Sequence, residues 1–168
     1  MVRERDLSEA WMEKCNSSMQ LTRAADYAVR VMVHLAKSPR DQRALLPAIG
    51  AATSAPESFL SKVLQSLTRA RLIESRRGPA GGFQISTRGR QASMLEVIEA
   101  IDGPVSLNVC LNPNRSCPRK GRCPAHLVWA KAQEALLGVL STALISDLAS
   151  GNYRDVPILV ERKTGTGD

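Results

Sequence analysis

Three of the four cysteines lie within fourteen residues, at Cys110, Cys117 and Cys123. The segment around them is polar, carries several prolines and contains nothing that could build a hydrophobic core. Thiolate sulfurs are soft ligands that select zinc, copper(I) or iron-sulfur clusters. An odd number of cysteines cannot pair fully into disulfides. The spacing therefore predicts a loop that binds a metal centre or reacts through its thiols, and we expect this loop to govern the activity of the chain.

Four kinds of chemistry are open to such a loop: an iron-sulfur cluster, a thiol switch without metal, a structural zinc site and a cysteine nucleophile. The absence of any Cys-x-x-Cys pair disfavours zinc. A nucleophile needs a base, and the only histidines are His34 and His126. His34 falls on the apolar side of a predicted helix, where a packed core residue is the simpler interpretation, and no group that would orient a base is visible. We therefore do not expect an enzyme.

The elements that hold this loop must come from one small, mainly helical chain. The 168 residues amount to about one domain. Hydrophobic residues make up 43% of the chain, with only two each of Trp, Tyr and Phe, so the core must consist mostly of Leu, Val, Ile and Ala, which favours helices. No apolar run has the length of a membrane span, and residues 1–20 lack the apolar core of a secretory signal. We expect a cytoplasmic protein that does not bind membranes.

The basic charge is concentrated in one segment. The net charge is +7 at pH 7. Residues 19–90 hold twelve Lys and Arg against four Asp and Glu, a balance of +8, whereas the rest of the chain holds eleven against twelve, a balance of −1. A local excess of cations is the electrostatic signature of a phosphate-binding surface, although a solvated basic face would show the same excess. This distribution indicates nucleic acid as the partner of residues 19–90.

Three helices are predicted in the first part of that segment. Apolar residues recur at helical spacing from Thr22, a good N-cap, to the stop at Ser38-Pro39. A short second helix is predicted over residues 45–52. A third begins at residues 53–57, where a capping hydroxyl precedes a proline and an acid, and runs to about residue 70. Two short helices joined by a tight turn indicate a helix-turn-helix.

A β-hairpin is predicted directly after these helices, over residues 72–86. Two strand-like pieces flank a turn rich in glycine and proline. A hairpin in this position makes the domain a winged helix, and the pair Arg76 and Arg77 lies at the mouth of the wing, where long cations can reach phosphates or a narrow minor groove. The order helix, turn, helix, basic hairpin is more specific than any of its parts.

The rest of the chain is predicted to link and dimerise. An amphipathic helix is predicted over residues 93–101, before the cysteine loop. After the loop, from residue 124, apolar residues, mostly Leu, recur at steps of three and four up to the stop at Gly151. One long helix with this much apolar face favours dimerisation, and a two-fold protein suits a pseudo-palindromic DNA site. The predicted organisation is a disordered N-terminal extension at 1–18, a winged helix-turn-helix domain at 19–90, a linking helix and cysteine loop at 91–123, a dimerisation helix at 124–150 and a tail at 151–168.

Five motifs, in order, resemble the IscR/NsrR/BadM-type winged-helix transcription regulators, in their three-cysteine iron-sulfur branch. The resemblance covers residues 19 to about 150. It is carried by residues 19–30 (MQLTRAADYAVR), 57–67 (ESFLSKVLQSL), 77–83 (RGPAGGF), 97–103 (VIEAIDG) and the cysteine trio. Residues 1–18, including Cys15, precede the usual start of the family at Met19, so Cys15 is not expected to be a ligand.

The resemblance implies a homodimer that binds double-stranded operator DNA through the third helix and the wing. It further implies a two-iron or four-iron cluster whose state sets the affinity for DNA in response to nitric oxide, redox stress or cluster supply. Cys110, Cys117 and Cys123 match the cluster cysteines. Two residues match fourth ligands of the family, Asp26 on the first helix and His126 shortly after the last cysteine. A metal-free, thiol-based redox-switch regulator is the alternative.

The DNA-reading residues follow from the predicted third helix and wing. The apolar side chains of Phe59, Leu60, Val63, Leu64 and Leu67 would hold the helix to the core. The opposite face would then meet base edges and phosphates, while the wing would contribute its arginines and the peptide groups of its turn. The predicted DNA-binding residues are Ser54, Ser58, Ser61, Lys62, Gln65, Arg76, Arg77, Gly78 and Gly81.

Overall fold

The computed structural model describes residues 21–39, 42–78 and 80–152. The predicted extension, residues 1–18 with Cys15, and residues 153–168 of the predicted tail lie outside these ranges. The described chain is mainly helical with one two-stranded antiparallel sheet, as predicted. In chain order the elements are α2 (Arg23–Lys37), α3 (Leu46–Thr53), α4 (Glu57–Arg69), β1 (Ile73–Arg76), β2 (Gly82–Ile85), α5 (Thr87–Gln91), α6 (Met94–Asp102), the 3-10 turns η1 (Val109–Leu111) and η2 (Lys120–Arg122), α7 (His126–Thr142) and α8 (Ile145–Ser150).

Helix α2 forms the centre of the core because one of its faces carries only small and medium apolar side chains. It begins as predicted at Thr22, whose hydroxyl accepts a hydrogen bond from the N–H of Ala25 at 3.2 Å. At the same end the carboxylate of Asp102 accepts from both the N–H and the hydroxyl of Thr22, at 3.1 and 2.7 Å. The start of α2 is thereby tied to the end of α6. The buried face comprises Ala25, Ala28, Val31, Met32, Leu35 and Ala36.

The turn between α3 and α4 differs from the prediction in its capping. Pro56 is the N-cap of α4 and no side chain caps the helix. The hydroxyl of Thr53 instead donates to the carbonyl of Ile49 at 2.7 Å, and Ser54 ends α3 in the left-handed conformation at φ 54°. Both hydroxyls therefore belong to the end of α3, and the expected capping hydroxyl of α4 is wrong.

Helix α4 packs with the predicted apolar face toward the core, with one exception. Leu60, Val63, Leu64 and Leu67 are buried. Phe59 is 46% exposed, so its predicted place in the core is wrong. Its ring instead meets that of Tyr27 edge-on, with 6.0 Å between the centroids.

The wing is a hairpin of β1 and β2 in which Ile73 pairs with Ile85 and Arg76 with Gly82. Ala44, ahead of α3, forms an isolated antiparallel bridge with Phe83 through two backbone hydrogen bonds, at 2.8 and 2.9 Å. The turn closes through the N–H of Gly81, which donates to the carbonyl of Gly78 at 2.8 Å. A Cβ at Gly81 would collide with the carbonyl oxygen of Arg76, so this position requires glycine.

The predicted single helix over residues 124–150 is broken into α7 and α8 at residues 143–144. At the break, the N–H of Met94 donates to the carbonyl of Ala143 at 2.8 Å and the N–H of Ile145 donates to the carbonyl of Ala92 at 2.9 Å. Ser93 and Leu144 thus form an isolated antiparallel bridge. Because this bridge takes the backbone out of the helical conformation, the prediction of one continuous helix is wrong here.

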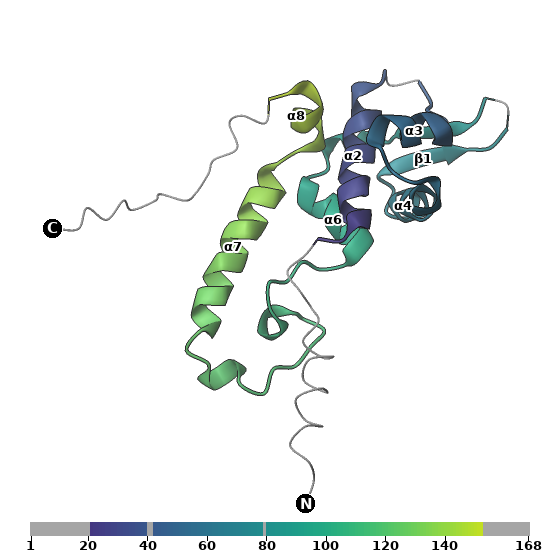
Figure 1. The fold of residues 1–168 in the computed structure, drawn as a ribbon. Helices are drawn as coiled ribbons and strands as arrows, with labels where there is room; N and C mark the ends of the chain where they lie inside the picture. Colours follow the sequence, from purple (N-terminus) through teal and green to yellow (C-terminus); the bar gives the residue numbers. More distant parts are fainter. Residues whose placement is uncertain (1–20, 40–41, 79, 153–168) are drawn as a thin grey trace, which may run out of the picture.

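The elements are arranged as a winged-helix part from which α7 extends (Figure 1). Helices α2, α3, α4 and the hairpin lie together, with α6 beside α2. Helix α8 packs back on α2, and α7 runs away from it toward the cysteine loop, which lies at the opposite end of the molecule from the wing. Among the described helices none is both long and apolar enough to cross a membrane.

Candidate functional site

A groove of about 690 Å³ lies between the exposed face of α4 and the wing. It brings together four residues that the sequence predicts to bind DNA, Ser61 and Gln65 from α4 and Arg76 and Arg77 from the wing. Helix α4 supplies its side because its other face is buried, and the hairpin supplies its edge because β1 follows α4 after a tight turn. The remaining wall is formed by Leu46, Leu64, Thr68, Arg69, Ser75 and Phe83.

The three polar residues among these, Thr68, Arg69 and Ser75, were not predicted to bind DNA. Arg69 lies four residues after Gln65 on α4, and therefore continues the same helical face as Ser58, Ser61 and Lys62. That spacing was a signal in the sequence that would have found it. Ser75 carries no such signal, since it becomes part of the groove only through the pairing of β1 with β2.

The other predicted residues of α4 lie outside the groove lining but on the exposed side of the helix. Ser58 and Lys62 are exposed. Within the described part of the chain Lys62 has neither an ion pair nor a side-chain hydrogen bond, so its ammonium is available to a phosphate. The Ser61 hydroxyl donates to the Glu57 carbonyl at 3.3 Å. Ser54 is exposed as well, at the end of α3 rather than on α4.

The wing presents its two arginines to solvent beside a turn held in an unusual conformation. Arg76, Arg77 and Gly78 are exposed, and Gly78 has φ +103°. The N–H of Gly81 is already donated to Gly78, so Gly81 shapes the turn and does not offer this amide to a phosphate. The cations of the wing are therefore its available phosphate-binding groups.

The three cysteines of the loop are free thiols, but they are not gathered into one metal-binding group. Cys110 is 8% exposed within η1, and Cys117 and Cys123 are half-buried. No group of three His, Cys, Asp or Glu side chains within the described ranges has the geometry to hold a metal ion. The loop therefore carries the predicted donor atoms without gathering them into a centre.

Helix α7 begins at His126, two residues after the predicted start, and the backbone N–H of His126 donates to the carbonyl of Cys123 at 3.1 Å. Its Nδ1 is buried and has no hydrogen-bond partner in the described part of the chain. A buried imidazole nitrogen left without a partner is unfavourable unless something else binds it. His126 thus lies one turn from Cys123, and its Nδ1 is available as a metal ligand.

Asp26, the other candidate fourth ligand, lies in the first turn of α2. Its carboxylate forms an ion pair with Arg30 at 2.7 Å and its side chain is 53% exposed. The guanidinium of Arg30 lies 5.9 Å from the centroid of the Tyr27 ring, whose edge meets Phe59. Asp26 is therefore already partnered, and the structure does not group it with the cysteines of the same chain.

Comparison with known proteins relates the chain to regulators of transcription. Residues 21–151 match the family model described as "Rrf2: Iron-dependent Transcriptional regulator". The chain is 29% identical to the HTH-type transcriptional regulator NsrR of Geobacillus kaustophilus, over 86% of this chain and 99% of the relative. It is 27% identical to the HTH-type transcriptional regulator IscR of Serratia proteamaculans, over 86% and 87%. Among solved structures, CymR, the global cysteine regulator of B. subtilis, has the same fold, with a TM-score of 0.63 and 24% identity over 79% of this chain and 97% of that one.

Proposed function

Because the chain belongs to the Rrf2 family of transcriptional regulators, which are not enzymes, we propose that it binds operator DNA with an affinity set by an iron-sulfur cluster in its cysteine loop. The proposed signal is nitric oxide, redox stress or the supply of clusters. The observation that carries the proposal is the placement of a basic groove and a free-thiol loop at opposite ends of one molecule.

The groove supports duplex DNA as its ligand. Arg69, Arg76 and Arg77 supply cations for phosphates, and Gln65 and Ser61 supply groups that can read base edges. In a helix-turn-helix protein the second helix enters the major groove while flanking groups contact the backbone. We assign α4 the first role and the wing the second, with Ser54, Ser58, Lys62 and Gly78 beside them.

The donor atoms of the loop fit an iron-sulfur cluster in kind. Cys110, Cys117 and Cys123 would hold it, with the unpartnered Nδ1 of His126 or the carboxylate of Asp26 as fourth ligand. The ligands must be drawn together on binding, because the described residues form no metal group by themselves. When bound, the cluster would supply a centre that reacts with oxidants or nitric oxide. The movement of the loop as it closes around the cluster would then be transmitted to the winged-helix part.

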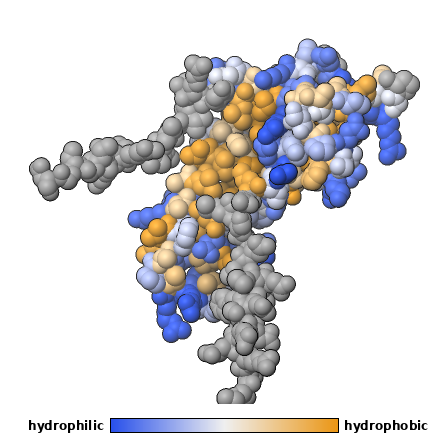
Figure 2. All heavy atoms as spheres, in the orientation of Figure 1, coloured by the Kyte–Doolittle hydropathy of each residue, from blue (hydrophilic) through white to orange (hydrophobic). Residues whose placement is uncertain are grey.

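A homodimer is proposed from the exposed apolar surface of α7. Leu127 and Val128 are 72% and 68% exposed, and Leu140 is the one residue of α7 classed as buried. On the face shown in Figure 2 hydrophobic residues gather over the middle of the molecule, where α6 and α7 lie. An isolated helix with this much uncovered apolar surface is typical of a protein interface. A second copy with its own α7 would cover it and place two wings on one pseudo-palindrome.

Anaerobic purification tests the cluster. We expect a brown protein with visible absorption and acid-labile sulfide, because thiolate-bound iron-sulfur clusters absorb in the visible range. Cys117→Ser should lose the colour, and Cys15→Ser, the matched control, should keep it. A colourless wild-type protein with stoichiometric zinc would refute the cluster.

Operator binding tests the regulation. Duplexes are first selected from a random pool by the cluster-bound and the cluster-free protein in parallel. The affinity of the cluster-bound, cluster-free and nitric-oxide-treated forms is then measured at one salt concentration. We expect the forms to differ by at least about fivefold, the lower end of allosteric coupling. Equal affinities would contradict control by the cluster.

A metal-free thiol switch is the second candidate, and the free, ungathered thiols favour it. In that case Cys110, Cys117 and Cys123 would oxidise to a disulfide or to sulfenic acid. The two candidates separate by mass spectrometry of the oxidised, iron-free protein. A disulfide that changes operator affinity without any iron supports the switch, whereas affinity that follows iron content alone excludes it.

A further inference from the structure

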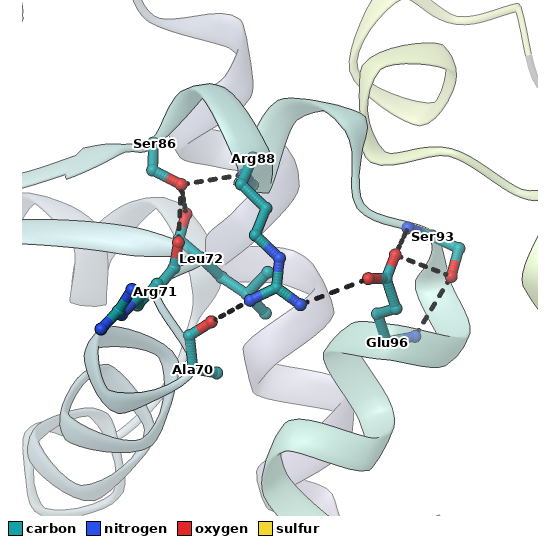
Figure 3. A network of polar contacts seen from close by, with 8 residues as sticks. Ala70, Arg71, Leu72, Ser86, Arg88, Ser93 and Glu96 are labelled. Atoms are coloured by element: carbon teal, nitrogen blue, oxygen red, sulfur yellow. Dashed lines mark hydrogen bonds and ion pairs between the residues drawn. The ribbon is translucent and has the colours of Figure 1, made fainter.

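Arg88, in the short helix α5, connects the end of α4 with the start of α6. Its Nη1 donates to the carbonyl of Ala70 at 2.6 Å, and its Nη2 forms an ion pair with the carboxylate of Glu96 at 3.5 Å. Figure 3 shows the guanidinium lying between these two partners. Ala70 is the C-cap of α4 and Glu96 lies in the first turn of α6.

The end of α4 needs such support because its backbone turns sharply there. Arg71, the next residue, adopts φ +59°, a left-handed conformation that favours glycine, and the N–H of Leu72 closes the turn on the carbonyl of Leu67 at 3.0 Å. The hydroxyl of Ser86, directly after β2, donates to the carbonyl of Arg71 at 2.8 Å. Together Ser86 and Arg88 fix the point at which α4 leaves for the wing (Figure 3).

On the other side, Glu96 is fixed by the start of α6. Its second carboxylate oxygen accepts from the N–H of Ser93 at 2.9 Å, and the Ser93 hydroxyl accepts from the N–H of Glu96 at 3.2 Å, which together form a capping box. Ser93 also pairs with Leu144 at the break between α7 and α8. Helix α6 leads at its other end into the cysteine loop. The position of Glu96 is therefore coupled to the positions of α6 and α7, the helices on either side of the cysteine loop.

We propose that Arg88 is a positioning residue for operator binding: by bridging the Ala70 carbonyl and the Glu96 carboxylate, it sets the orientation of α4 and the wing relative to α6. It does not contact DNA itself. The inference rests on the proposed function only in so far as α4 reads the operator, and it requires no cluster.

The test compares Arg88→Lys with wild type in the full-length, cluster-free protein on one selected duplex. Lysine keeps the charge but cannot span both partners as the planar guanidinium does. We expect about a fivefold loss of affinity in Arg88→Lys. Arg88→Gln, which removes the charge, should show a similar loss with an unchanged slope of log K against log salt. Glu96→Gln should cause a similar loss, and the double variant should be no weaker than Arg88→Lys alone, since both remove one bridge.

Arg90→Lys is the matched control. Arg90 lies on the same helix and donates to the carbonyls of Ala36 and Ser38, at 2.8 and 2.9 Å, and so supports the end of α2 instead of α4. Arg90→Lys should lower the midpoint of thermal unfolding about as much as Arg88→Lys does, and it should leave operator affinity unchanged. An equal loss of affinity in Arg90→Lys would make the role of Arg88 merely structural.

Four other results would overturn the inference. Wild-type affinity in Arg88→Lys would remove the positioning role, and a slope reduced by about 0.9 in Arg88→Gln would make Arg88 a direct phosphate contact. Additive losses in the double variant would mean that Arg88 and Glu96 act separately. A wild-type protein that selects no duplex at all would refute the proposed function together with this inference, whereas a selective wild type with an equally tight Arg88→Lys refutes the inference alone.

Discussion

At the scale of single residues, the exposed face of α4 and the wing carry cations that form no ion pair within the described part of the chain. The exposed face of α4 carries Lys62, which makes no ion pair within the described chain, and the wing carries two exposed arginines. Cations held on rigid elements but left unpaired favour phosphate binding over stabilisation of the fold. The cysteine loop at the other end of the molecule also has an unpartnered polar group next to it, since the Nδ1 of His126 is buried and has no hydrogen-bond partner in the described part of the chain.

Replacing Lys62 with alanine should weaken binding to all duplexes alike, because a phosphate contact carries no sequence information. The slope of log K against log salt should fall by about one. A salt titration by fluorescence anisotropy measures both quantities. Lys131→Ala, on the exposed surface of α7, is the control and should change neither. An unchanged slope in Lys62→Ala would exclude the phosphate contact.

At the scale of elements, the pattern of side chains predicted the features that depend on residues close together in the sequence. It failed where hydrogen bonds to backbone far away in the sequence determine the structure. The limits of α2 followed from Thr22 and Ser38, and the wing from its glycines, because caps and turns are local. The break at Ala143 could not be read, since it contains no glycine or proline and arises from hydrogen bonds to Ala92 and Met94. Helix α5 was missed because its five residues are too few for any periodicity.

The candidate site divides in the same way. The exposed face of α4 followed from its buried face, which is why Ser61 and Gln65 were found. The cysteines were found by residue type alone. What could not be predicted is their separation in space, because the path of an irregular loop depends on contacts that leave no pattern in the sequence.

The wing as an element depends on Gly81. Gly81→Ala should distort the turn, because the added Cβ would collide with the Arg76 carbonyl, and should lower operator affinity about tenfold while the helical circular dichroism stays unchanged. Gly121→Ala is the control, since a Cβ there meets nothing within 4 Å. Binding by the cluster-free protein is the measurement. Wild-type affinity in Gly81→Ala would mean that the wing does not contribute to DNA binding.

At the scale of the whole molecule, α7 separates the two functional ends. It leaves the winged-helix part at the bridge between Ser93 and Leu144 and reaches the cysteine loop at His126 (Figure 1). Its apolar stripe is divided: Leu140 packs on its own domain, while Leu127 stays exposed. Only the part of α7 near the loop is left for a partner.

Leu127→Glu combined with Val128→Glu should raise the dimer dissociation constant at least tenfold, because burying two carboxylates in an apolar interface is strongly unfavourable. Sedimentation velocity over a range of concentrations measures this shift. Ser150→Glu, at an exposed position on α8, is the control. A wild-type protein that is monomeric at all concentrations would contradict the proposed homodimer.

The bridge at the end of α7 also bears on how such a molecule could evolve. Both of its bonds, Met94 to Ala143 and Ile145 to Ala92, join backbone atoms and so place little demand on side-chain identity. The loop between α6 and α7 can therefore change its length and its ligands while the two helices keep their anchorage. A lineage could exchange one sensing chemistry for another in this loop and retain the same apparatus for reading DNA.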